Sequence, residues 1–279
     1  MGLIHCRLAS NLQQFMHWST GTKAIRTIVG RSFRPSNFCS MINLQVTTFL
    51  FFGLSHLSAT FSIVAYDPET GDLGVAVQSK FFGVGSVVPY AAADVGAIAT
   101  QALANPRYGP VGLQLLQEGA TPEKIKELFA EQDPGIERRQ FLIIDKDGNL
   151  ATHTGKQCLD FAGHKSGKNY AVAGNILTSK CVIDGMAQAF EDARCKGDGE
   201  LAEWLLDALE AGQQAGGDKR GKQSAAILVV RKNGGYAGLM DRYVDIRIDD
   251  HETPIQELKR LLKLHRKFYP QSRLKKREK

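Results

Sequence analysis

Short apolar runs separated by turn residues dominate the chain from residue 60 onwards. The first two runs, TFSIVAYD at residues 60–67 and LGVAVQSK at residues 73–80, are joined by the segment PETGD. Proline and glycine between two runs rich in β-branched residues are typical of a hairpin turn. We therefore predict that the folded part of the chain begins with a β-hairpin.

The same pattern recurs twice further along the chain. Residues 139–155 predict a hairpin that turns at Asp147 and Gly148, and residues 224–248 predict another that turns at residues 233–235. Residues 83–102 are rich in Val, Ala and Gly and predict further buried strand.

Apolar residues at helical spacing fill the segments between these strand blocks. The clearest example has Thr121 as its cap and Pro122 in its first turn. The predicted helices cover residues 105–119, 121–132, 181–195, 200–215 and 253–269. Hairpins in every strand block favour antiparallel sheets, and paired helices between them favour helical layers over the outer faces of two stacked sheets.

An apolar segment at residues 41–59, MINLQVTTFLFFGLSHLSA, directly precedes the first predicted hairpin. It is short for a bilayer span and ends in the small residue Ala59, which is typical of a signal peptide, although Leu57 is bulkier than usual near a cleavage site. We predict that residues 1–59 are a leader, that the protein is exported to the periplasm or the extracellular space, and that the mature form has no membrane span.

Two alternatives for the leader stay open. Met41 can be the true start, which makes residues 1–40 an artefact of the assigned gene start. Residues 1–40 can also be an organellar transit peptide, because they contain arginine and serine but no acidic residue. A cytoplasmic or an organellar location is the alternative to export.

The formal net charge of +6 is unevenly distributed. Residues 1–59 carry five basic side chains and no acidic one, so 30 basic and 29 acidic side chains remain after residue 59. This balance does not predict a nucleic-acid partner. The basic residues near the C-terminus indicate a solvated helix face and tail, with a specific anionic partner as the alternative.

The sequence predicts neither a metal nor a cofactor. The five cysteines lack CxxC spacing, and phosphate-binding and dinucleotide-binding motifs are absent. The segment DKDGN resembles the start of a calcium loop, but the later glutamate of such a loop is missing, so we predict a turn. Export would permit one disulfide among Cys158, Cys181 and Cys195, and the sequence does not select the pair.

Four stretches combine glycine with polar residues at predicted strand ends: VQSKFFGVGS, ATQALANPRYGP, VAGNIL and AGGDKRGKQSAA. The last is the densest, with six polar or charged residues between Asp218 and Ser224. A polar loop between a helix and a strand has the same composition, so the alternatives are a loop and a site.

The opening TFSIVAYDPETGDLGVAVQSK, together with ATQALANPRYGPVGLQLL, GNIL and the stretch around residue 218, resembles a proteasome-like family of uncharacterised proteins, a domain of unknown function within the Ntn-hydrolase superfamily. Members of that family open with Thr-Phe-Ser-Ile-Val-Ala. The likeness runs from Thr60 to about His265. It implies an α+β fold, a four-layer αββα sandwich of two stacked antiparallel sheets of the Ntn-hydrolase type.

The resemblance also implies an N-terminal nucleophile. In that superfamily the first residue of the mature chain attacks an acyl carbon, and its own α-amine takes the proton. This assigns the nucleophile to Thr60, with Ser79 and Lys80 within its reach. Lys80 would keep the amine neutral by charge repulsion or bind an anionic substrate group. This chain has Gln78 where the proteasome-like branch carries an aspartate, so the proton-transfer groups of that branch do not transfer to it.

Further site residues follow from the same resemblance. Backbone amides around Gln101 and Ala102, or the side chain of Asn175, are candidates for the oxyanion hole. We expect the substrate to contact Ser79 and Gln101. Three further residues would shape the far end of the substrate site: Asp218, Arg220 and Ser224.

We therefore predict a catalytic domain at residues 60–250, followed by a C-terminal helix and basic tail at residues 251–279. The expected function is hydrolysis of an amide or related acyl bond in a small-molecule or peptide-like substrate, by catalytic residues Thr60, Lys80 and Asn175. The alternative is a non-catalytic ligand-binding protein or a homo-oligomeric protein on the same fold. Homo-oligomers are common among proteasome-like folds.

Overall fold

The computed structural model of the chain describes residues 59–270, so the predictions for residues 1–58 and for the tail after residue 270 lie outside the described residues. The strands are β1 (Thr60–Asp67), β2 (Asp72–Ser79), β3 (Pro89–Ala92), β4 (Gly96–Ala102), β5 (Arg139–Asp145), β6 (Leu150–Thr154), β7 (Gly163–Gly167), β8 (Tyr170–Asn175), β9 (Ser224–Val230) and β10 (Arg242–Ile248). The helices are α3 (Tyr108–Gln117), α4 (Pro122–Gln132), α5 (Cys181–Lys196), α6 (Leu201–Gln214) and α7 (Pro254–Phe268), with short 3₁₀ turns η1 (Val84–Ser86), η2 (Ile136–Arg138) and η3 (Tyr236–Gly238).

The strands form two antiparallel sheets, which confirms the antiparallel prediction. The larger sheet has the order β10-β9-β2-β1-β8-β7, and the smaller one has the order β3-β4-β5-β6. The first predicted hairpin is β1 with β2, and the other two are β5 with β6 and β9 with β10. Because β1 has a neighbour on each side, its first residue, Thr60, lies within the sheet.

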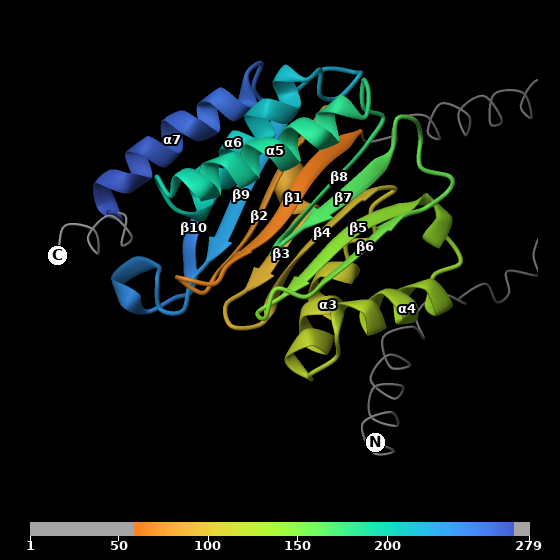
Figure 1. Cartoon of the computed structure of the whole chain (residues 1–279), viewed down its shortest axis with the longest axis horizontal. Helices are drawn as coiled ribbons and strands as arrows, with labels where there is room; N and C mark the ends of the chain where they lie inside the picture. The colour runs from red at the N-terminus through yellow and green to blue at the C-terminus, as the bar shows by residue number, and fades with distance from the viewer. Residues whose placement is uncertain (1–58, 271–279) are drawn as a thin grey trace, which may run out of the picture. The chain divides into compact units, whose positions relative to one another are not determined.

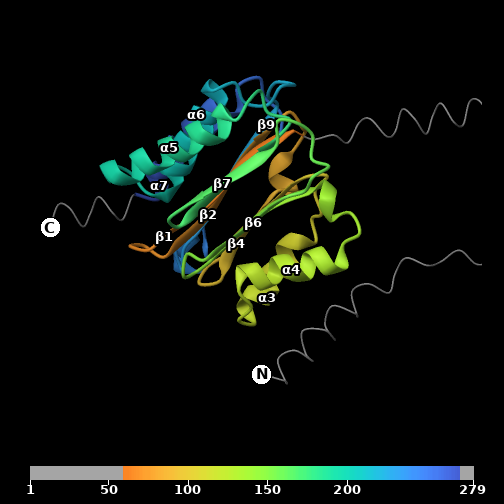
Figure 2. The ribbon, with the colours of Figure 1, turned by 45° about the vertical axis from the view of Figure 1, so that its right-hand side comes forward.

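The side chains of β1 alternate between two hydrophobic cores. Phe61 and Ile63 pack under helices α5 and α6, whereas Val64 points into the space between the two sheets. Helices α5, α6 and α7 lie on one face of the six-stranded sheet, and α3 and α4 lie against the four-stranded sheet (Figure 1). Figure 2 shows the two sheets stacked between these groups of helices. The fold is therefore α+β with two antiparallel sheets.

Two local predictions, the Thr121 cap of α4 and the turn at residues 145–149, are confirmed. The hydroxyl of Thr121 accepts a hydrogen bond from the backbone N–H of Lys124, as expected of a helix cap. In the segment DKDGN, the carboxylate of Asp145 accepts hydrogen bonds from the N–H groups of Asp147 and Asn149, which confirms the turn. Among residues 59–270, no group of three or more metal-ligating side chains gathers.

Residues 83–102 differ from the prediction of continuous buried strand. The chain forms η1 first, because Gly83 adopts a left-handed conformation with φ of 65° and the N–H of Val84 bonds to the hydroxyl of Ser224. Only then do β3 and β4 follow. This arrangement brings the segment after β2 against the first residue of β9.

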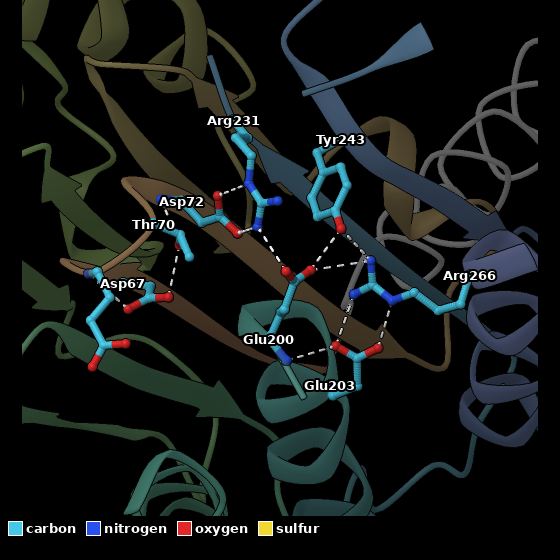
Figure 3. A network of polar contacts seen from close by, with 9 residues as sticks. Asp67, Thr70, Asp72, Glu200, Glu203, Arg231, Tyr243 and Arg266 are labelled. Carbon is cyan, nitrogen blue, oxygen red and sulfur yellow. Dashed lines mark hydrogen bonds and ion pairs between the residues drawn. The ribbon is translucent and has the colours of Figure 1, made fainter. Parts of the chain in front are cut away.

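Buried charges connect β2 with the C-terminal part of the chain. The Arg231 guanidinium donates from Nε and Nη2 to the two carboxylate oxygens of Asp72, each at 2.6 Å. It also lies 3.4 Å from Glu200 and stacks 3.9 Å from the ring centroid of Tyr243. Burial raises the pKa of Asp72 above its usual range in spite of the arginine beside it. Figure 3 shows the network and its connection to Arg266.

Helix α7 is attached to the same network. Arg266 donates to both carboxylate oxygens of Glu203 at 2.8 Å and to the hydroxyl of Tyr243 at 2.7 Å. The apolar side chains Leu258 and Leu262 complete the attachment by packing into the core under the helices. The helix therefore shares a core with β9 and β10. None of the helices within residues 59–270 is long and apolar enough to cross a membrane.

Candidate functional site

A row of four polar side chains crosses the six-stranded sheet where β1 begins. Thr60 lies opposite Ser79 of β2 and Asn175 of β8, and Ser79 lies opposite Ser224 of β9. All four are buried, and Thr60 is 1% exposed. Since side chains of one face recur every second residue, these residues share the face of Val64 and Val77, which line the space between the sheets.

The hydroxyl of Thr60 belongs to a short chain of hydrogen bonds. Thr60 Oγ1 donates to Ser79 Oγ at 3.1 Å, and Ser79 Oγ donates to the backbone carbonyl of Ala59. Nη2 of Arg220 donates to the same carbonyl at 3.0 Å. Two donors therefore converge on the oxygen of the peptide bond between residues 59 and 60, which is the bond predicted to be cleaved.

A buried carboxylate fixes the position of Arg220. Asp218 accepts from the backbone N–H of Lys80 at 2.9 Å, and from the backbone N–H, Nε and Nη2 of Arg220 at 2.8, 3.2 and 3.0 Å. The side chain of Asp218 is fully buried, and that of Arg220 is 32% exposed. A planar guanidinium held at two nitrogens has a defined direction, so Asp218 aims Arg220 at the start of β1.

The four-stranded sheet supplies amides to the other side of this space. Gln101 and Gln140 are paired across β4 and β5, and both are buried. Gln140 Oε1 accepts from Gln101 Nε2 at 2.8 Å and from Asn175 Nδ2 at 3.1 Å. Its Nε2 donates to the Thr154 hydroxyl and to the carbonyls of residues 163 and 174 at 2.9 to 3.0 Å. Gln140 thus joins the two sheets beside Thr60.

Gln140 is a site residue that was not predicted from the sequence. A signal was present, because Gln140 shares its strand face with Leu142 and Ile144 and is the one polar residue of that face within β5 that is fully buried. A buried glutamine on an apolar face needs partners for its amide, and these partners define the neighbourhood of Thr60.

The amides next to Thr60 are only partly satisfied. Gln101 Nε2 and Asn175 Nδ2 each lie 3.5 Å from the carbonyl oxygen of Thr60, which is longer than an ordinary hydrogen bond. The Oε1 atom of Gln101 is buried and has no hydrogen-bond partner among the described residues. The backbones of Gln101 and Ala102, the other oxyanion candidates, pair with Gln140 and Arg139 of β5.

The remaining sequence candidates lie near this region in different roles. The side chain of Lys80 is exposed, and only its backbone N–H contacts Asp218. The hydroxyl of Ser224 donates to the carbonyl of Phe81 and accepts from Val84, so it holds the segment after β2. Gln78 points to the opposite face of β2 from Ser79, under the helices, and both of its side-chain polar atoms are buried without a partner among residues 59–270.

Three of the cysteines are described, and all three are free thiols. Cys158 is half-buried and donates to the carbonyl of Arg139, and Cys181 and Cys195 are exposed. Burial raises the pKa of the Cys158 thiol, which disfavours the reactive thiolate. Cys6 and Cys39 lie outside the described residues.

The fold has two antiparallel sheets, and buried polar side chains from both sheets meet at the start of β1. The chain belongs to the family of unknown function DUF1028, whose model matches residues 60–258. It is similar to the crystal structure of protein SPO2555 from Silicibacter pomeroyi, a DUF1028 protein, with 33% identity, a TM-score of 0.67 and coverage of 75% of this chain and 86% of that one. No curated protein matches the chain.

Proposed function

We propose that the protein is an N-terminal-threonine hydrolase of an amide or related acyl bond, with a four-layer sandwich of the Ntn-hydrolase type. One observation carries the proposal. Thr60 is the first residue of an inner strand, and its hydroxyl lies in a buried polar row between the two sheets. A hydroxyl that is surrounded by hydrogen-bonding groups and shielded from bulk water is suited to act as a nucleophile.

The reaction requires cleavage before Thr60. In the uncleaved chain the nitrogen of Thr60 is an amide, which cannot accept a proton. Cleavage converts it into an α-amine with an ordinary pKa of about 7.7–8.0, which is a usable base near neutral pH. We propose that residues 1–59 are a leader and that the protein is exported, so leader removal would also be the activating step.

The proposed chemistry has two half-reactions. Thr60 Oγ1 attacks the acyl carbon of the substrate while its proton passes to the α-amine. The C–N bond then breaks, and the amine leaves with that proton. Water attacks the resulting ester on Thr60 and gives a proton to the α-amine. The bond between the acyl carbon and Thr60 Oγ1 then breaks, the acid is released, and the proton returns from the α-amine to Oγ1, which restores the hydroxyl and the neutral amine.

The neighbouring residues have supporting roles in this proposal. Ser79 orients the hydroxyl of Thr60 through the 3.1 Å hydrogen bond. Asn175 is a candidate for orienting Thr60 or for binding the oxyanion, because its Nδ2 lies near the Thr60 carbonyl and is fixed by Gln140. Lys80, at the surface, would attract an anionic substrate rather than act as a base. The contacts of Ser224 suit a role in holding the segment after β2.

A ligand-binding protein without turnover is the second candidate. It is favoured by the buried, unpartnered Oε1 of Gln101, which a ligand donor could satisfy, and by the absence of a basic amine at Thr60 in the uncleaved chain. The N-terminus of the protein purified from its native host separates the two candidates. Intact mass and Edman degradation are expected to give Thr60 as the first residue. A start at any other residue would refute the nucleophile.

Substitution of Thr60 tests the chemistry directly. Mature protein with Thr60→Ala is expected to lose all covalent turnover of a panel of amides, lactams and acyl-amino acids, whereas Thr60→Ser keeps part of it. Thr60→Ala removes both the hydroxyl and the γ-methyl of a buried, hydrogen-bonded residue, so the unfolding free energy should fall by about 1–3 kcal/mol while the protein still folds. Wild-type activity should decline as the pH falls through the pKa of the amine, because only its neutral form accepts a proton. Undiminished turnover by Thr60→Ala would place the nucleophile elsewhere.

A further inference from the structure

The uncleaved chain contains a built-in ligand for the groups around Thr60. The carbonyl oxygen of Ala59 is bound by the Ser79 hydroxyl and by Nη2 of Arg220. Ala59 itself is fully buried. Cleavage before Thr60 removes this carbonyl and vacates the volume that Ala59 occupied, whereas Ser79 and Arg220 remain in the sheet and in the loop before β9.

The groups that surround the position of the removed Ala59 carbonyl are suited to bind an anion. The guanidinium of Arg220 has donors only, and the new α-amine carries N–H donors both in the neutral form that acts as the base and in the protonated form. The Ser79 hydroxyl has already been shown to donate in this direction, because it bonds the Ala59 carbonyl. Three donors around one oxygen position favour a charged acceptor over a neutral one, since hydrogen bonds between ionised groups are about twice as strong as neutral ones.

The direction of the Arg220 guanidinium is already fixed before a ligand binds. Its bidentate contact with the fully buried Asp218 fixes the plane of the guanidinium, and Nη2 donates to Asp218 and to Ala59 from the same nitrogen. A preorganised donor loses little conformational entropy when it binds. The contact with Asp218 persists after cleavage, so the direction of Arg220 does not depend on Ala59.

The loops around the position of the Ala59 carbonyl carry a net positive charge, which also favours an anion. The loops at residues 80–88 and 215–223 carry Lys80, Lys219, Arg220 and Lys222 and a single acid, Asp218, which is a net charge of +3. Two acidic segments adjoin these loops. The backbone carbonyl of Asp160 accepts from Lys219 Nζ at 3.0 Å, and at residues 249–250 Asp249 pairs with Arg247 while Asp250 accepts from the side chain of Gln223. A positive rim attracts anionic molecules and raises their local concentration.

We propose that Ser79 and Arg220 bind the carboxylate of the substrate in the mature protein, so that the enzyme acts on acyl compounds that carry a free carboxylate close to the bond to be cleaved. The inference rests on the proposed function for the position of the cleavage and for the acyl chemistry. It adds the substrate class. Arg220 and Ser79 bind the substrate, and Asp218 is a positioning residue that acts through Arg220.

Binding can be measured without turnover, which separates this inference from the proposed function. Protein starting at residue 60, released from a ubiquitin fusion cut before that residue, is prepared with Thr60→Ala so that no probe is consumed. N-acetylglycine, which carries a carboxylate, and N-acetylglycinamide, its neutral analogue of the same size, are titrated while the arginine Nε–Hε signals are followed by NMR. The Arg220 signal is assigned from its loss in Arg220→Lys.

The expected result is selective binding of the charged probe. N-acetylglycine should shift the Arg220 signal with a Kd at least about tenfold lower than that of N-acetylglycinamide, and the preference should weaken with added salt. The uncleaved chain should show neither shift, because the Ala59 carbonyl fills the position. Arg242→Gln, a matched substitution of an exposed arginine at the other end of the sheet, should bind as the parent does.

Variants at the site keep the test open to refutation. Because Arg220→Gln leaves the buried Asp218 without its cation, the pair Asp218→Asn/Arg220→Gln is measured as well, and thermal melting checks that each variant folds. Folded variants should lose the preference for N-acetylglycine. Equal binding of the two probes by the parent, or an unchanged preference in the folded double variant, overturns the inference.

The remaining outcomes distinguish the two proposals. If protein starting at Thr60 hydrolyses neutral amides as readily as those with a carboxylate, the hydrolase proposal stands and the substrate class is wrong. If the carboxylate binds selectively at Arg220 but no acyl compound is turned over, the substrate class stands as a ligand class and the hydrolase proposal is wrong.

Discussion

The two ends of strand β2 bury polar groups in opposite ways. At its first residue, Asp72 enters a network of full charges with Arg231 and Glu200, in which each carboxylate faces a guanidinium. At its last residue, Ser79 lies in a row of neutral hydroxyls and amides beside Thr60. The ion pair next to that row, Asp218 with Arg220, differs from the network at Asp72 because Arg220 also donates outside the pair, to the carbonyl of Ala59. One end of this eight-residue strand thus lies in a network of paired charges, and the other end lies in a polar cluster that leaves the Oε1 acceptor of Gln101 without a partner among the described residues.

The difference separates stability from function. Charges that neutralise one another within the fold attach α7 and β10 to the sheet and present few groups to a ligand (Figure 3). Neutral groups with spare hydrogen-bonding capacity cost less to bury and can change partners when a substrate enters. We therefore expect substitutions at the charged end to act mainly on stability, and substitutions at the Thr60 end to act mainly on binding and turnover.

The largest effect on stability is expected from Arg231→Met. The variant removes the cation between Asp72 and Glu200, whose side chains are fully buried. Breaking a buried ion pair by removing one partner costs roughly 3–5 kcal/mol, because the other charge stays buried. Urea unfolding at pH 7 measures the loss.

Two further variants test the cause of that loss. Arg242→Met, at an exposed arginine, should change the unfolding free energy by no more than about 0.5 kcal/mol. Adding Asp72→Asn to Arg231→Met should recover part of the stability, because a neutral amide is cheaper to bury than a carboxylate. A loss below about 1 kcal/mol in Arg231→Met would show that the network is not a determinant of stability.

A smaller effect is expected from Gln140→Leu, and Gln78→Leu is its matched control. Both glutamines are fully buried in neighbouring parts of the two sheets, but Gln140 makes five hydrogen bonds and Gln78 has two unpartnered polar atoms. Leaving the partners of Gln140 unsatisfied should cost about 1–3 kcal/mol. Replacing the unpartnered amide of Gln78 should be neutral or stabilising.

The same pair compares the space between the two sheets, where the side chain of Gln140 lies, with the helix-covered face of the six-stranded sheet, where that of Gln78 lies. Gln140→Leu should also reduce turnover, since Gln140 holds Asn175 and Gln101 beside Thr60. Gln78→Leu should leave turnover unchanged, because Gln78 lies on the helical face of β2. Urea unfolding and initial rates on one shared substrate measure both quantities. Equal destabilisation by the two variants would contradict the role of Gln140 as the link between the sheets.

Much of the fold could be predicted because its elements are marked locally. The hairpin at residues 60–80 has alternating apolar residues and a Pro/Gly turn, and α4 has a cap and an apolar stripe. Strand β7 has no such mark, since GHKSG is polar and mostly exposed. β7 forms because its backbone pairs with the edge of β8, and the five residues of β7 carry no sequence pattern that would predict this pairing.

The site was predictable to the extent that its residues lie at strand ends. Thr60 and Ser79 terminate the two strands of one hairpin, so their pairing follows from the register, and Asn175 follows from the resemblance. The direction of Arg220 toward Ala59 did not follow, because it depends on Asp218 and on the bridge between Asp218 and Leu177. Contacts between loops far apart in sequence require the folded structure.

The smallest effect concerns the pH dependence of stability at the charged end. His265 of α7 has a buried Nδ1 without a partner among residues 59–270, and its ring stacks on Tyr269 at 4.5 Å. Burial, and next the positive charge of Arg266, lower its pKa below the usual 6.5, against weaker opposing effects of Tyr243 and of the carboxylates of Glu203 and Glu200. The folded protein therefore holds this proton less tightly than the unfolded chain does.

The sign of the effect follows from that difference in proton binding. As the pH falls below about 6.5, the unfolded chain takes up the proton first, so the unfolding free energy decreases and continues to decrease until the folded form is also protonated. His265→Phe keeps the stacked ring and removes the titration, so its stability should vary less between pH 8 and pH 5 than that of the parent. His164, whose pKa burial also lowers, accounts for a further part of the slope, and His164→Gln should remove it. Urea unfolding at several pH values measures the slopes, and an unchanged slope in His265→Phe would mean that His265 does not contribute to it.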